Sequence, residues 1–304
     1  GEQNYEERQV QELFVDGIAE SITDRDGSLL GIPLVFDTLA LFYNRDYFNS
    51  ANIPSPPATW DEVVEQAKTL ARFSPVGGIT RAGIAIGTGT NVDHSGDILL
   101  ALILQEGGAV LDPERTRSAL AGDATASAVT FYTSFSTPTK KTYTWNAFFD
   151  RSLDAFASGQ AAMAIGYARD VPRIVEQTPQ LNFDVAPFPQ PTSRVSDVNF
   201  GRFDLFVVSR TSANADLAWR FLVWLSERDP AKRYLDAVGL PPARRDLSRA
   251  KPVREYLIPF SDAVLSARTI PVTIGDPLAG ILGELIDSVV NRKFTIEQAV
   301  SRAD

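Results

Sequence analysis

Apolar and polar positions follow two periods along the chain, one typical of strands and one typical of helices. Residues 31–44, GIPLVFDTLALFYN, form a nearly continuous apolar run that predicts a buried strand. Residues 60–70 place valine, alanine and leucine at helical spacing behind a capping box formed by Thr59 and Glu62, which predicts an amphipathic helix. Because such segments alternate along the chain, the pattern indicates an α/β protein.

Three further helices carry local signals. The apolar run that begins at residue 96 and stops at the glycines 107–108 predicts a buried helix. Asp229, followed by a proline, is predicted to cap the start of another helix, and Thr295 with Gln298 is predicted to cap the last one.

Asp37 and Thr38 interrupt the apolar run at its middle. A buried carboxylate without partners costs several kcal/mol, so Asp37 must find hydrogen-bond donors, end the strand or face a wet cleft. The alternative is that the two residues form an ordinary turn or cap.

Two further polar positions adjoin apolar segments. Trp145 and Asn146 pair an apolar ring with an amide, a combination that suits the apolar face and hydroxyl rim of a sugar ring. Burial of Trp145 in the core is the alternative.

Tyr167, Arg169 and Asp170 directly follow a predicted strand at 161–165. In open α/β sheets, ligands bind at the carboxyl ends of the strands, so these three residues are candidates for ligand contact. A solvated turn is the alternative there.

Three further features of the sequence argue against a nucleotide site, a metal site and a catalytic pair of carboxylates. GTGTN at 87–91 lacks the Lys-Ser/Thr of a phosphate-binding loop and the third glycine of a dinucleotide fingerprint, so we interpret it as a polar loop. His94 is the single histidine of the chain, so no second imidazole is present to complete a metal site. No pair of carboxylates is distinguished as catalytic by its setting.

Composition narrows the classes of function. The 304 residues, 44% hydrophobic and 22% charged, favour a globular chain of two domains. A formal charge of -9 argues against nucleic-acid binding, which depends on clustered lysine and arginine. The absence of cysteine excludes disulfides and thiolate metal sites, and no apolar run approaches the roughly 18 residues that a membrane span requires.

Several segments, in this order, resemble the extracellular solute-binding proteins of ATP-binding-cassette (ABC) importers, the group that includes maltodextrin-binding protein. They are residues 31–72, the segment LDAFASGQAAMAIGY at 153–167, residues 203–247 and the closing NRKFTIEQAVSRAD at 291–304. The resemblance covers nearly the whole chain.

The resemblance implies a periplasmic-binding-protein-like α/β fold with two hinged lobes of discontinuous sequence that close on a ligand. It places the first lobe at 1–36 and 201–262 and the second at 37–200 and 263–304. The family has about two more strand–helix units, on the order of 80 to 100 residues, ahead of the helix predicted at 10–21. The resemblance therefore also leads us to expect an incomplete first lobe.

The resemblance also implies which positions contact the ligand. They lie where the chain first passes from one lobe to the other, on a loop of the second lobe, at a position where the family often stacks an aromatic ring on a sugar, and where the chain returns to the first lobe. The expected ligand-binding residues are Asp37, Thr38, Thr90, Asn91, Trp145, Asn146, Tyr167, Arg169, Phe200, Gly201, Arg202 and Asp276. The last two are included for their proximity to these positions.

The function implied is capture of a sugar or related polyhydroxylated solute outside the cytoplasm and its delivery to the transmembrane subunits of an ABC permease. Such a protein is expected to be a monomer that catalyses no reaction and uses no cofactor or metal. Two alternatives stay open: a glycoside hydrolase with two carboxylates flanking an aromatic-lined cleft, and an interaction fragment that binds no solute.

Overall fold

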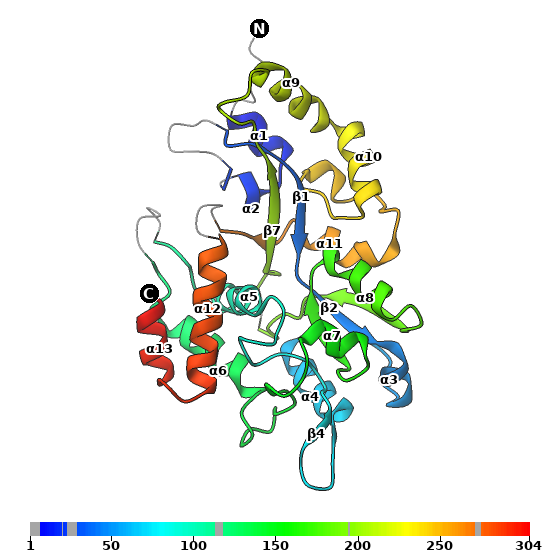
Figure 1. Cartoon of the computed structure of the whole chain (residues 1–304), viewed down its shortest axis with the longest axis vertical. Helices are drawn as coiled ribbons and strands as arrows, with labels where there is room; N and C mark the ends of the chain where they lie inside the picture. Colours follow the sequence, from blue (N-terminus) through cyan, green and yellow to red (C-terminus); the bar gives the residue numbers. More distant parts are fainter. Residues whose placement is uncertain (1–6, 20, 23–28, 113–117, 194, 271–274) are drawn as a thin grey trace. The chain divides into compact units, whose positions relative to one another are not determined.

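The computed structural model describes residues 7–19, 21–22, 29–112, 118–193, 195–270 and 275–304, and these form two compact units. The first unit comprises residues 1–38, 167–169 and 199–273, and the second comprises residues 39–166, 170–198 and 274–304. The chain thus passes from one unit to the other several times (Figure 1). This discontinuity agrees with the predicted α/β architecture of two lobes.

The observed boundaries differ from those predicted. The chain leaves the first unit after residue 38 and returns at residue 199, near the predicted boundaries at 36/37 and 200/201. A short segment at 167–169 also joins the first unit. The predicted boundary at 262/263 requires correction, because β8 (Ala267–Arg268) pairs with β7 (Asn199–Phe206) and the described residues 263–270 belong to the first unit.

The first unit is built on a three-stranded sheet with the order β1-β7-β8. Strand β1 (Ile32–Thr38) runs antiparallel to β7, with Asp37 opposite Arg202 and Thr38 opposite Gly201. Strand β8 runs parallel to β7. The α-helices in the described part of this unit are α1 (Glu7–Leu13), α2 (Asp16–Ala19), α9 (Ala215–Leu225), α10 (Arg228–Val238) and α11 (Ile258–Ala263).

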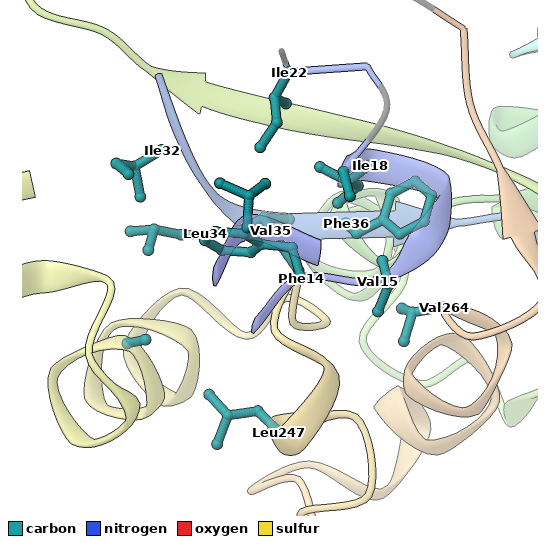
Figure 2. Close-up of a cluster of buried hydrophobic side chains, with 14 of the residues drawn as sticks. Phe14, Val15, Ile18, Ile22, Ile32, Leu34, Val35, Phe36, Leu247 and Val264 are labelled. Atoms are coloured by element: carbon teal, nitrogen blue, oxygen red, sulfur yellow. The ribbon is translucent and has the colours of Figure 1, made fainter. Parts of the chain in front are cut away.

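The core of the first unit forms where the α1–α2 segment meets β1. Figure 2 shows Phe14 and Ile18 beside Val35 and Phe36, and all four side chains are fully buried. Each such side chain stabilises the fold by roughly 1.5–3 kcal/mol relative to its exposed state. At the far end of β1, Gly201 allows close strand packing, because a Cβ there would lie 2.5 Å from the ring of Phe36.

The second unit contains an antiparallel sheet with the order β5-β2-β6 and a two-stranded ribbon, β3-β4. Residues 31–44, predicted as one strand, form β1 and β2 (Ala40–Asn44), separated at Leu39 where the chain changes units. The remaining strands are β3 (Arg72–Phe73), β4 (Ile79–Arg81), β5 (Met163–Gly166) and β6 (Phe183–Pro187).

Helices cover the sheet of the second unit, and α5 (Ser95–Gln105) is its central helix, with residues 95–103 all buried. Figure 1 shows α5 beside α6 and α12, in agreement with their contacts. The predicted capping boxes begin α4 and α13 as expected. The helices other than α5 are α3 (Arg45–Ser50), α4 (Trp60–Leu70), α6 (Asp123–Ser134), α7 (Ser152–Ala157), α8 (Val171–Gln177), α12 (Gly275–Val290) and α13 (Ile296–Ala303).

Candidate functional site

Asp37 lies at the end of β1 with its carboxylate fully buried. It binds residues 167–169, a short segment that belongs to the first unit although the chain on either side belongs to the second. Oδ1 accepts a hydrogen bond from the backbone N–H of Ala168 at 2.9 Å, and Oδ2 accepts one from the backbone N–H of Arg169 at 3.1 Å. The Oγ1 of Thr38, also fully buried, donates to the carbonyl of Phe260 at 3.0 Å. Both residues therefore have structural partners within the first unit.

Arg169 connects Asp37 to a second carboxylate. Its Nε lies 3.1 Å from Oδ2 of Asp37, and its terminal nitrogen lies 3.3 Å from Oδ2 of Asp204. Burial raises the pKa of Asp37 to about 6, although the charge of Arg169 and the hydrogen bonds from Ala168 and Arg169 oppose the rise. Two carboxylates share one guanidinium, so this Asp37–Arg169–Asp204 cluster carries a net negative charge when all three groups are ionised.

The sheet gathers further predicted residues around this cluster. Arg202 lies directly opposite Asp37 on β7 and is partly exposed, whereas Phe200 is fully buried. Tyr167 is 1% exposed, so its ring offers no open stacking face in this structure. Asp204, which we did not single out from the sequence, lies two positions after Arg202 on β7 and therefore on the same face of the strand, so the period of two was a usable signal.

In the second unit, Trp145 belongs to the core. Its indole N–H donates to Oγ1 of Thr88 and Oδ1 of Asn91, both at 3.1 Å, and its ring stacks on Phe149 with centroids 4.6 Å apart. Because Trp145 is fully buried, the expectation that it offers an open plate to a sugar requires correction. The structure instead supports the alternative interpretation, a core tryptophan.

Asn91 holds the loop that follows Trp145. Its amide donates to the carbonyls of Asn146 and Phe149 at 3.1 and 3.0 Å, and Oδ1 of Asn146 accepts a hydrogen bond from the backbone N–H of Phe148 at 3.0 Å. The ring of Phe148 is 99% exposed. This loop thus presents one aromatic side chain fully to solvent, and the sequence offered no signal for choosing Phe148 over its neighbours.

Thr90, the residue before Asn91, is exposed, and Asp287 of α12 orients its loop. Oδ1 of Asp287 accepts from the backbone N–H of Gly89 at 2.8 Å, and Oδ2 accepts from the Thr90 hydroxyl. Gly89 is required for this approach, because a Cβ there would lie 2.2 Å from the carbonyl oxygen of Gly283. No local signal linked Asp287 to this loop, because 197 positions separate it from Thr90.

His94 is half-buried. Its Nε2 lies 2.9 Å from Oδ2 of Asp170, and it precedes α5 in a left-handed conformation with φ of 58°. Burial lowers the pKa of His94, but the hydrogen bond and charge of Asp170, with the charges of Asp97 and Asp93, raise it further, so it stands above its usual value. Nearby, Arg151 binds Asp93.

The predicted residues thus fall into two groups. Asp37, Thr38, Tyr167, Arg169, Phe200, Gly201 and Arg202 belong to the first unit, and Thr90, Asn91, Trp145 and Asn146 belong to the second. Asp276 lies in the first turn of α12, and its side chain is outside the described residues. Within the described parts of the chain, no group of three or more histidine, cysteine, aspartate or glutamate side chains could hold a metal ion.

Comparison with known proteins identifies the family. The family model described as bacterial extracellular solute-binding protein matches residues 5–258. This chain belongs to that family. The resemblance inferred from the sequence is therefore confirmed.

This solute-binding protein is also similar to individual relatives. A protein of Brucella abortus (strain 2308) named as a binding protein is 26% identical over 296 residues, which span 92% of this chain and 68% of the relative. The crystal structure of the cyclic alpha-maltosyl-1,6-maltose binding protein from Arthrobacter globiformis superimposes with a TM-score of 0.78 at 19% identity, covering 97% of this chain and 74% of that one. These comparisons confirm the predicted fold class.

A third similar structure contains a different kind of bound molecule. The structure of UgpB from Mycobacterium tuberculosis in complex with glycerophosphocholine has a TM-score of 0.71 at 19% identity, and covers 95% of this solute-binding protein and 73% of that chain. Proteins of this one fold thus bind chemically different solutes. In the described residues of this solute-binding protein, no helix is both long and apolar enough to span a membrane.

Proposed function

We propose that this solute-binding protein captures a sugar or related polyhydroxylated solute outside the cytoplasm and delivers it to the transmembrane subunits of an ABC permease. The observation that carries the proposal is the match of the solute-binding family model to residues 5–258. Two features of the described residues support a carbohydrate: neutral hydroxyl and amide groups near an exposed aromatic ring, and carboxylate–guanidinium groups that suit hydroxyl hydrogen bonds.

In the second unit, we propose that Phe148 is the aromatic plate and that Thr90 and Asn146 are its polar neighbours. Phe148 is 99% exposed on a loop that Asn91 holds at both ends, so stacking on it would cost little ordering of the backbone. Trp145 and Asn91 serve as the base of this loop. Their role in solute binding would be to position Phe148 and Asn146.

In the first unit, we propose that Arg169 and Arg202 contact the solute. Both side chains are partly exposed, and Asp37 orients Arg169 through Oδ2. Asp37, Thr38, Tyr167 and Phe200 are buried and would act through the residues that they hold. Gly201 would contribute by its lack of a side chain. Because Arg169 already serves two carboxylates, it is poorly suited to bind a phosphate group.

The proposal is tested by a thermal-shift screen of the purified chain against monosaccharides, oligosaccharides, polyols and glycerophosphodiesters. Ligand at about 100 times its dissociation constant should add about 2.7 kcal/mol to the free energy of unfolding. A shift with one class of sugar, confirmed by calorimetry, would support the proposal. A shift with glycerophosphodiesters alone would replace the carbohydrate assignment, and no shift with any class would argue for an interaction protein.

The same samples test the hydrolase alternative. A glycoside hydrolase would release reducing ends from any oligosaccharide that shifts the melting temperature, whereas a binding protein would leave the oligosaccharide intact. The family is one of solute-binding proteins, so we expect the oligosaccharide to be recovered unchanged. Release of reducing ends that Asp37→Asn abolishes would overturn this expectation.

A further inference from the structure

A hollow lies within the second unit, and none of its lining residues belongs to the proposed solute site. Its volume is about 480 Å³, and it is lined by α4, α5, α6 and the segment after β6. Trp60, Leu102 and Phe131 supply apolar surface, and Asp61 and Glu106 supply carboxylates at the rim. Neither the family match nor the proposed function assigns a role to this hollow.

The aromatic wall of the hollow is held in place by its own contacts. The rings of Trp60 and Phe131 pack edge to face with centroids 5.4 Å apart. The indole N–H of Trp60 donates to Oε1 of Gln105 at 2.7 Å, and Nε2 of Gln105 donates to the carbonyls of Pro189 and Val198 at 2.9 and 3.1 Å. This wall is therefore preorganised, which lowers the entropic cost of binding a ligand.

The charged groups around the hollow are negative. Asp61 and Glu106 are both exposed, and Oδ2 of Asp61 accepts one hydrogen bond from Thr192 at 2.6 Å, which leaves its second oxygen available for a further donor. Glu106 is the C-cap of α5, where the partial negative charge of the helix end adds to that of the carboxylate. Among the described residues that line the hollow, none is lysine or arginine.

We propose that this hollow binds a small organic cation, an alkyl- or arylammonium ion. The apolar body would pack against the Trp60 and Phe131 rings, and the ammonium group would lie at the rim between Asp61 and Glu106. An uncharged compound of the same shape would lose the attraction of both carboxylates and the helix end. A carboxylate ligand would be repelled by them.

The experiment is calorimetric titration of the whole protein with phenethylammonium chloride, 2-phenylethanol and sodium phenylacetate, which share one ring and differ in charge. The expected order of affinity is cation, neutral compound, anion. Asp61→Asn and Glu106→Gln should each weaken the binding of phenethylammonium by about two- to fivefold, as expected for exposed charge pairs. Phe131→Leu should also weaken it, because leucine keeps an apolar wall but removes the ring face.

A matched control is Glu65→Gln, which makes the same charge change on α4 at an exposed residue paired with Lys68 and outside the lining of the hollow. It should change the affinity by less than about twofold. Equal binding of the neutral compound, an equal effect of Glu65→Gln and Glu106→Gln, or no heat up to tens of millimolar would each overturn the proposal. Arg194 follows Ser193 and lies outside the described residues, so the titrations are repeated in Arg194→Ala, where the same dependence on Glu106 is expected.

Discussion

Asp37 and Arg169 are joined twice, because the backbone N–H and the side-chain Nε of Arg169 both lie 3.1 Å from Oδ2 of Asp37. With the additional hydrogen bond from Ala168, these contacts fasten the segment at 167–169 to the end of β1. The carboxylate in the middle of the apolar run thus has a structural explanation: it supplies acceptors to a short segment whose backbone N–H groups would otherwise be buried without partners.

We predict that Asp37→Ala destabilises the protein more than Asp37→Asn. Alanine leaves the N–H groups of Ala168 and Arg169 without acceptors, and a buried unsatisfied group costs about 1–3 kcal/mol. Asparagine keeps one oxygen acceptor and removes a charge that burial disfavours. Urea unfolding of the two variants measures the difference, and Asp204→Asn, at a side chain that is 52% exposed, serves as the control with an expected loss below about 1 kcal/mol. Equal losses for Asp37→Ala and Asp204→Asn would contradict this account.

The contribution of Asp37 to the stability of the protein should fall as pH rises from about 4 to about 6. The pKa of Asp37 in the folded protein is raised to about 6 from 3.8, so the folded state binds more protons than the unfolded state in this interval. Asp37 therefore contributes stability that is fully present below about 3.8 and is lost as pH rises through about 6. At about 1.4 kcal/mol per pH unit, the interval corresponds to about 3 kcal/mol.

The measurement is the free energy of unfolding across this pH range for the wild type and Asp37→Asn. Other carboxylates contribute to both proteins, so the quantity of interest is the difference between their slopes. The wild type should lose stability relative to Asp37→Asn as pH rises. Parallel slopes would show that Asp37 does not titrate in this interval.

His94 should titrate above its usual pKa of 6.5, because Asp170 accepts its hydrogen bond and Asp97 and Asp93 add negative charge. A raised pKa means that His94 contributes stability below pH 6.5 and that this contribution is lost as pH rises through the folded-state value. The chain has one histidine, so its imidazole carbon resonance can be followed by NMR without assignment. Asp170→Asn should lower the measured pKa, and an unchanged value would contradict the role of Asp170.

Substitutions at Trp145 and Phe148 should have separate effects, one on the stability of the protein and the other on solute binding. Trp145→Ala removes a fully buried ring that stacks on Phe149, and a loss of about 3–5 kcal/mol is expected. Phe148→Ala removes a ring that is 99% exposed, so the free energy of unfolding should change by less than about 0.5 kcal/mol.

The binding arm of this comparison uses the sugar found in the thermal-shift screen. Phe148→Ala should weaken binding about tenfold or more, and Phe148→Tyr should retain it because tyrosine keeps the stacking face. Phe73→Ala, at another exposed phenylalanine of the second unit, is the control. Unchanged affinity in Phe148→Ala, with binding intact in the wild type, would exclude Phe148 while leaving the proposed function in place.

Local sequence signals predicted several elements correctly, because they depend on neighbouring residues. The Thr59–Glu62 and Thr295–Gln298 capping boxes both form, since each box joins groups only three positions apart. The buried helix at 95–105 was likewise readable from its apolar composition. Element starts without such a local bond were less accurate: α10 begins at Arg228 rather than after an Asp229 cap.

The candidate site was only partly readable, because its main contacts join distant positions. Asp37 was marked by its apolar neighbours, but its partners Ala168 and Arg169 lie 131 and 132 positions away. From the sequence, Trp145 could be either a sugar-binding ring or a core residue. Its hydrogen bonds to Thr88 and Asn91 support the core position. No local sequence signal distinguished Phe148 or Asp287 from neighbouring residues.

The sequence by itself therefore determined the α/β class, the family and the polar positions worth inspecting, because periodicity, caps and motif order are properties of neighbouring residues. Only the tertiary structure decided which of those polar groups are buried and which face solvent. Burial depends on what packs against a side chain from elsewhere in the chain. For this reason Asp37 and Trp145 became structural residues, while Phe148, without any distinguishing sequence signal, became the exposed aromatic.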